Sequence, residues 1–86
     1  MFYKTEFSPR VEKEARKISQ PDLKIIRRHI QDRLCEDPYH YGKPLGFSLK
    51  GSRSMRVGDY RVIYRIVEDT IYIEAIDKRA EVYGGH

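Results

Sequence analysis

The sequence predicts an α+β domain, in which an N-terminal strand and a two-helix hairpin precede antiparallel strands, with the helices on one face of a twisted sheet. Three observations support this class. Apolar residues recur with helical spacing in the first half, they recur with a period of two in the second half, and tight-turn signals divide that half into strands. The 86 residues suffice for one domain with a small core, so residues 1–86 are taken as a single unit.

Residues 2–7 are aromatic and partly alternating, which predicts the first strand. Ser8 and Pro9 are typical of a helix start, because a serine hydroxyl caps the first turn and proline suits the first helical position. This helix is expected to run for about ten residues. Its apolar stripe consists of Val11, Ala15 and Ile18.

The start signal recurs at residues 20–22, where proline comes early and an acid lies in the first turn. The second helix should end at Asp37-Pro38, and its short connection to the first predicts an antiparallel pair. Its apolar stripe consists of Leu23, Ile26, Ile30 and Leu34. Residues 37–51 then form a connection long enough to be either functional or partly loose.

The segment from Val57 to Tyr60, with Gly58-Asp59 at its centre, predicts a two-residue hairpin turn. This turn places Arg56 opposite Arg61. After a second turn at residues 68–69, the register pairs Ile66 with Ile71, Tyr64 with Ile73, and Val62 with Ala75.

Side chains alternate between the two faces of a strand, so this register assigns each residue to a face. The face expected to cover the helices collects Met55, Val62, Tyr64, Ile66, Ile71, Ile73 and Ala75. The opposite face collects Arg56, Arg61, Ile63, Arg65, Tyr72, Glu74 and Ile76.

Two interpretations of the arginine-bearing face stay open. Arg56 opposite Arg61 brings like charges together, which is destabilising on a sheet. Either Glu74 neutralises the arginines in a solvated salt-bridge cluster, or the pair receives a phosphate, which the guanidinium fork matches geometrically. Tyrosines at positions 39, 41 and 72 are candidates for base stacking or simply for packing at the edge of the core.

The tail after the last strand carries Arg79 and Tyr83, which share one side if a helical turn follows. Nearby cations lower the pKa of a tyrosine hydroxyl. Such a tyrosine is suited to take a proton from a ribose 2′-hydroxyl, with arginines stabilising the charge on phosphorus. Packing is the alternative role for Tyr83.

Composition excludes several other classes of function. The single cysteine, Cys35, rules out an internal disulfide and a cysteine-ligated zinc site, and the three histidines lack metal-ligand spacing. Neither a glycine-rich phosphate loop nor a run of apolar residues long enough to span a membrane occurs. No signal peptide is recognised at the start. We therefore expect a small soluble protein of the cytoplasm, without metal or cofactor, and its net charge of +4 weakly favours an anionic partner.

Several segments together resemble the RelE/ParE toxin superfamily, over essentially the whole chain. They are Leu49-Lys50-Gly51, the run from Arg56 to Tyr64, Lys78-Arg79, and Glu81-Val82-Tyr83. The resemblance implies a toxin of a type II toxin–antitoxin system, with a cognate antitoxin as partner. RelE-like members cut messenger RNA in the ribosomal A site without a metal, by attack of the ribose 2′-hydroxyl. ParE-like members share the fold, lack the catalytic set and poison DNA gyrase.

The resemblance also implies roles for individual residues. Arg61 matches the strand arginine that contacts the scissile phosphate, and Arg56 matches the second residue of a basic-x-basic pair. Arg79 matches the arginine after the final strand, and Tyr83 matches the C-terminal tyrosine. Independently of the resemblance, positive charge extends along the loop side through Lys43, Lys50 and Arg53. These three and Arg65 are the other basic residues expected to bind RNA.

Ser54 departs from the RelE-like pattern, because it stands where the first basic residue of the pair is common. Arg53 is adjacent, but alternation directs it toward the helices or the sheet margin. The departure favours a ParE-like toxin or a catalytically degenerate binding module, whereas the Arg79 and Tyr83 tail favours the ribosome-dependent nuclease. We expect the nuclease.

Overall fold

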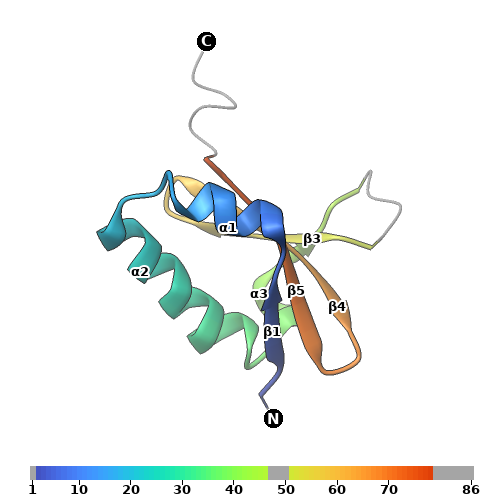
Figure 1. Ribbon diagram of the computed structural model, residues 1–86. Helices are drawn as coiled ribbons and strands as arrows, with labels where there is room; N and C mark the ends of the chain where they lie inside the picture. Colours follow the sequence, from blue (N-terminus) through green and yellow to red (C-terminus); the bar gives the residue numbers. More distant parts are fainter. Residues whose placement is uncertain (1, 47–50, 79–86) are drawn as a thin grey trace.

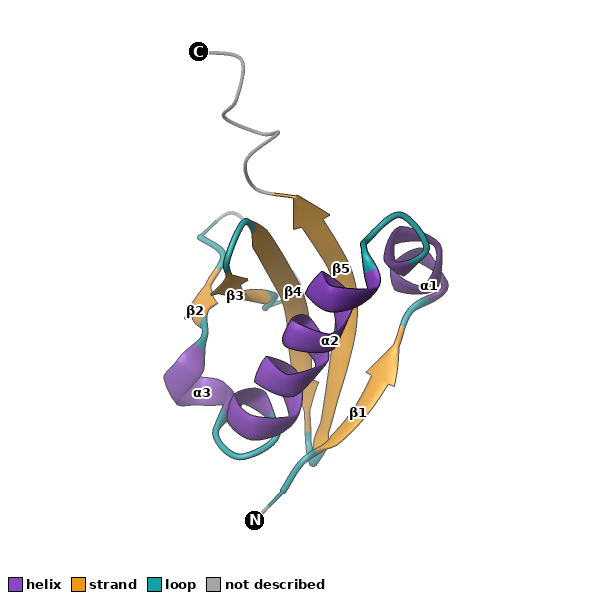
Figure 2. Ribbon diagram, turned by 90° about the vertical axis from the view of Figure 1, so that its left-hand side faces the viewer, coloured by secondary structure: helices purple, strands orange, loops and turns teal. Residues whose placement is uncertain are grey.

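The structure is a computed structural model that describes residues 2–46 and 51–78. This part of the chain forms a five-stranded sheet in the order β1-β5-β4-β3-β2, with the helices gathered on one face (Figures 1 and 2). The predicted α+β class is confirmed. In chain order the elements are β1 (Lys4–Phe7), α1 (Pro9–Ala15), α2 (Gln20–His29), the π-helical turn η1 (Ile30–Leu34), α3 (Pro38–Tyr41), β2 (Lys43–Pro44), β3 (Arg53–Val57), β4 (Tyr60–Val67) and β5 (Thr70–Lys78).

The start of α1 follows the prediction. The Ser8 hydroxyl accepts a hydrogen bond from the Val11 N–H at 3.1 Å, and Pro9 occupies the first turn. The helix is shorter than the ten residues expected. Its last turn tightens, because the N–H groups of Lys17 and Ile18 bond to carbonyls three residues back. Ile18 nevertheless reaches the core.

The second helix is capped by Ser19, whose hydroxyl accepts from the Asp22 N–H at 3.3 Å. The helical pattern then continues from α2 through η1, where the Cys35 N–H bonds to the Ile30 carbonyl five residues back. The whole predicted stripe is thereby buried, from Leu23 to Leu34.

Two short elements, α3 and β2, were not expected from the sequence. Asp37 begins a new helix as well as ending the previous pattern, because its carboxylate accepts from the His40 N–H at 3.2 Å. Gly42 follows α3, and a Cβ at this position would overlap the Tyr64 hydroxyl. Only glycine lets the chain pass this close to the core.

The hairpin between β3 and β4 has the predicted register, with Arg56 opposite Arg61. Gly58 occupies the left-handed region of the turn, at φ 59°. The register between β4 and β5 is also as predicted from the second turn to Tyr64 and Ile73. β1 runs parallel to β5 and completes the sheet.

Beyond Tyr64 and Ile73 the predicted register is wrong, because β5 contains a bulge at Glu74. Val62 lies opposite Ile76 instead of Ala75, and Ile63 lies opposite Ala75. Ile76 therefore joins the core, with 6% of its surface exposed, whereas the prediction placed it on the arginine-bearing face. Strict alternation cannot predict that Ile76 changes face, since a bulge inserts one extra residue into the strand.

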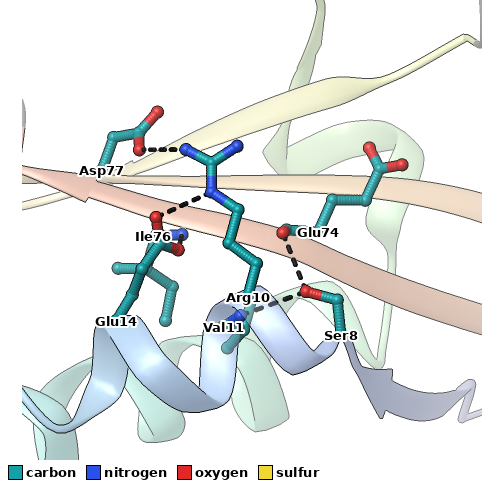
Figure 3. A network of polar contacts seen from close by, with 7 residues as sticks. All are labelled: Ser8, Arg10, Val11, Glu14, Glu74, Ile76 and Asp77. Carbon is teal, nitrogen blue, oxygen red and sulfur yellow. Dashed lines mark hydrogen bonds and ion pairs between the residues drawn. The ribbon is translucent and has the colours of Figure 1, made fainter.

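Helix α1 stabilises the bulged part of β5, as Figure 3 shows. β1 stops pairing with β5 at Ile73, so among residues 2–46 and 51–78 the rest of that edge has no partner strand on this side. The Ser8 hydroxyl donates to the Glu74 carbonyl at 2.9 Å, and the Glu14 carboxylate accepts from the Ile76 N–H at 2.8 Å. Side chains of α1 thus replace the missing ladder bonds.

Glu14→Ala is expected to lower the free energy of unfolding by about 1–3 kcal/mol, because it leaves the part-buried Ile76 N–H without its acceptor. Urea denaturation monitored by circular dichroism measures the change. The exposed Glu12 of the same helix provides the matched control, Glu12→Ala. Equal losses in the two variants would show that the Glu14 contact does not hold the bulge.

The core lies between the helices and the sheet. Its largest fully buried side chains are Tyr64, Ile26, Leu34, Ile71, Ile73, Val62 and Pro38. In the described part of the chain, no helix is both long and apolar enough to cross a lipid bilayer.

Candidate nucleic-acid interface

The sheet face opposite the helices carries three arginines, Arg56, Arg61 and Arg65, and we call it the arginine face. Arg56 lies directly across the hairpin from Arg61. Side chains at such paired positions start about 4.5–5.5 Å apart at their Cβ atoms and project to the same side. The fold therefore starts two arginine side chains from adjacent positions of neighbouring strands, on one face, as the turn predicted.

Arg56 is exposed, and within residues 2–46 and 51–78 it makes no ion pair. Its Nε lies 3.5 Å from the Gly58 carbonyl of the turn, which is a weak contact. Arg61 is half-buried and faces Asp77 across β4 and β5, a neighbour that the bulge brings into place. The Asp77 carboxylate accepts a hydrogen bond from Arg10 of α1 at 3.2 Å (Figure 3).

Arg65 differs from the other two because Glu74 binds it directly. Its Nε donates to the Glu74 carboxylate at 3.2 Å, and its guanidinium lies 5.7 Å from the centre of the Tyr72 ring. The other oxygen of that carboxylate accepts from the Ser52 hydroxyl at 2.7 Å. Neutralisation by Glu74, the first of the two interpretations of this face, thus applies to Arg65. Arg56 has no carboxylate partner among the described residues.

Arg53 lies on the other side of β3, as alternation suggested. It donates to the Tyr39 carbonyl at 3.0 Å and to the Gly42 carbonyl at 2.9 Å, and it stacks over the Tyr39 ring. The neighbouring Tyr64 hydroxyl donates to the Pro38 carbonyl at 2.6 Å, and burial raises the pKa of Tyr64. Arg53 therefore links α3 and the residue that follows it to β3 by hydrogen bonds. Its side chain lies on the side of the sheet opposite the arginine face.

Lys43 of β2 and Ser54 of β3 are directly paired, and Ser54 is in turn paired with Ile63 of β4. Both Lys43 and Ser54 consequently lie on the arginine face. Lys50, Arg79 and Tyr83 fall outside the described residues.

The remaining candidates have simple environments. Tyr39 and Tyr41 of α3 are largely exposed, and Tyr72 lies beside Arg65. Burial raises the pKa of the Cys35 thiol, as expected for a structural cysteine. Within the described ranges, no three His, Cys, Asp or Glu residues are grouped closely enough to hold a metal ion.

Sequence reasoning missed the groups around the bulge. The predicted pairing of Val62 with Ala75 left no place for Asp77 opposite Arg61, and the partners of Glu74 and Ile76 on α1 carried no periodic signal. The sequence held one hint of these contacts. Glu14 is an acid four residues after Arg10 on the first predicted helix.

Comparison with known proteins finds relatives that match this chain along nearly its full length. The family described as ParE toxin of the type II toxin–antitoxin system parDE matches residues 5–83. Toxin RelG of Mycobacterium tuberculosis is 32% identical over 85 residues, which cover 96% of this chain and 98% of RelG. Toxin RelE of the same organism is 44% identical over 43 residues, or 50% of this chain and 44% of that toxin.

Solved structures agree with this relationship. The RelBE2 toxin–antitoxin complex from M. tuberculosis contains a chain that superposes with a TM-score of 0.85 at 30% identity, covering 93% of this chain and 94% of that one. The isolated Escherichia coli RelE toxin gives a TM-score of 0.74 at 21% identity, with 95% and 92% covered, which shows the shared fold.

Proposed function

Because the chain belongs to the ParE toxin family of type II toxin–antitoxin systems and has RelE toxins among its relatives, we propose that it is a metal-independent endoribonuclease that cuts messenger RNA on the ribosome. One observation carries the choice of activity. Arg56 and Arg61 are paired on the face that the helices leave uncovered, and Arg56 has no ion-pair partner among the described residues. Such a pair suits a phosphodiester, because each guanidinium can bind phosphate oxygens with two parallel hydrogen bonds.

In the proposed reaction the ribose 2′-oxygen attacks the adjacent phosphorus. A bond forms between O2′ and phosphorus, and the bond to the 5′-oxygen of the next nucleotide breaks. The 2′-hydroxyl gives up one proton, and the leaving 5′-oxygen takes up one. The products are a 2′,3′-cyclic phosphate and a 5′-hydroxyl end, so the step needs no outside nucleophile.

Arg56 and Arg61 hold the scissile phosphate and neutralise the charge that grows on its oxygens. Arg79 adds to this stabilisation in the pentacovalent state, and Tyr83 orients or deprotonates the 2′-hydroxyl. The last two roles rest on the family resemblance. A protein acting on translating ribosomes works in the cytoplasm.

The rival proposal is a ParE-like toxin that poisons DNA gyrase, or a degenerate module that only binds. Ser54 favours it, because this position lacks the basic residue common in RelE-like proteins. The matched family is itself described by ParE toxins. The rival predicts gyrase-linked DNA breaks with intact messages.

A partner protein also belongs to the proposal. Several related solved structures are RelE–RelB complexes, including those from M. tuberculosis and Pyrococcus horikoshii. We propose that a cognate antitoxin neutralises this toxin by covering its sheet and grooves.

Induction of the protein in cells, followed by sequencing of messenger RNA ends, separates the two activities. The proposal predicts new 5′-hydroxyl ends within coding regions that keep phase with codons, and that co-expression of the antitoxin suppresses them. Broken DNA joined to gyrase, with unchanged messages, would instead establish the rival. Normal growth at high expression of the protein alone would contradict both toxin activities and leave the degenerate binding module.

A further inference from the structure

The short strand β2 brings a fourth cation to the arginine face. Lys43 is directly paired with Ser54, and Ser54 lies two residues from Arg56 on the same face of β3. Lys43 is therefore a diagonal neighbour of Arg56, and diagonal neighbours on adjacent strands lie about 7–8 Å apart. A lysine stem spans that distance easily.

The side chains in the row beside Lys43 are short or apolar. Across the sheet it consists of Lys43, Ser54, Ile63 and Ala75, one from each strand. The serine side chain leaves room above β3, and none of the three neighbours in the row carries charge. In the described ranges the Lys43 side chain makes neither a hydrogen bond nor an ion pair, and it is exposed.

The backbone around Lys43 is held firmly. The Arg53 guanidinium binds the carbonyl of Gly42, the residue just before it, at 2.9 Å. Gly42 packs against the Tyr64 hydroxyl, and the Leu45 N–H bonds to the Ser52 carbonyl at 2.9 Å. The lysine side chain therefore projects from a backbone that is already ordered. Less conformational entropy of the backbone is lost when its amine binds.

We infer that Lys43 adds a cation to the arginine face and binds the RNA backbone phosphate next to the one held by Arg56 and Arg61. This inference rests on the proposed function and adds a residue from a different strand to it. Arg65 is the other cation on the face, but Glu74 already binds it. Lys43 is thus a binding residue, which positions the RNA strand without touching the reacting atoms.

The test measures binding of a short, fluorescent, 2′-O-methyl RNA, which cannot be cleaved, by anisotropy at several salt concentrations. Each lost phosphate contact lowers the slope of log affinity against log salt by about 0.7 for a single strand, which corresponds to about fivefold weaker binding near 0.1 M salt. Lys43→Ser is expected to show this change. Lys24→Ser, at an exposed position of α2, is the matched control and is expected to bind like the wild type.

A transposed variant makes the test specific to the location of the charge. Lys43→Ser combined with Ser54→Lys returns an amine to the same row and is expected to restore affinity and slope. If Lys43→Ser binds like Lys24→Ser while Arg56→Ala weakens binding, the inference is wrong and the proposed function stands. If the wild type binds no better than the Arg56→Ala/Arg61→Ala double variant, both are wrong.

Discussion

Arg61→Ala is expected to slow cleavage of messenger RNA on programmed ribosomes by about 10²–10³-fold, the loss typical of removing one preorganised donor to a developing oxyanion. Arg61 has the right surroundings for that role. It is half-buried between Arg56 and Asp77 in the middle of the sheet, so its backbone is held by ladders on both sides. Single-turnover kinetics measure the rate of the chemical step.

Two variants separate loss of chemistry from loss of structure. Arg61→Lys keeps the charge but loses the planar fork, so it should recover only part of the rate. Arg28→Ala, at an exposed position of α2, should cleave like the wild type. A cleavage rate for Arg61→Ala within threefold of the wild type would remove Arg61 from the reaction.

Tyr83→Phe is expected to lower the cleavage rate by about 10²–10⁴-fold, which is the usual contribution of a general base. Tyr83 lies outside the described residues, so this expectation comes from the family resemblance and from its chemistry. Phenylalanine keeps the ring and removes only the hydroxyl. Stability and RNA binding should therefore be unchanged.

The pH dependence of the rate identifies the role of Tyr83. A general base must be ionised before it can take a proton, so a Tyr83 in this role makes the rate depend on the ionisation of its hydroxyl. The wild-type rate should rise with pH and level off once this hydroxyl is ionised, and the rise should vanish in Tyr83→Phe. A slow variant that keeps the same profile would mean that another group takes the proton.

The parts of this fold that were predictable from sequence are those in which local chemistry specifies local geometry. Ser8 and Pro9 start α1 as expected, because a cap and a fixed φ act within one turn. The Gly58-Asp59 turn fixes the pairing of Arg56 with Arg61 for the same reason. The central pair of the candidate site could therefore be derived without coordinates.

The parts that were not predictable depend on distant partners. The Glu74 bulge moves Ile76 into the core, and it is supported by contacts from α1 more than sixty positions earlier in the chain. β2 has only two residues, too few for any periodic signal. The position of Lys43 on the arginine face was therefore visible only once its pairing with Ser54 was known.

The bulge also connects stability with the site. It sets Asp77 opposite Arg61, and Asp77 is bound by Arg10 of α1. The Arg10 side chain is well exposed, so this ion pair contributes at most about 1 kcal/mol. The contact joins α1 to the part of β5 that faces Arg61.

The most direct test of the account is a double-mutant cycle of cleavage rates for Arg56→Ala, Arg61→Ala and the combined variant on programmed ribosomes. Two guanidinium groups that hold one phosphate act as a unit, so the combined variant should be little slower than Arg61→Ala alone. Losses that multiply would instead show two arginines acting independently on separate groups, and would contradict the shared phosphate site.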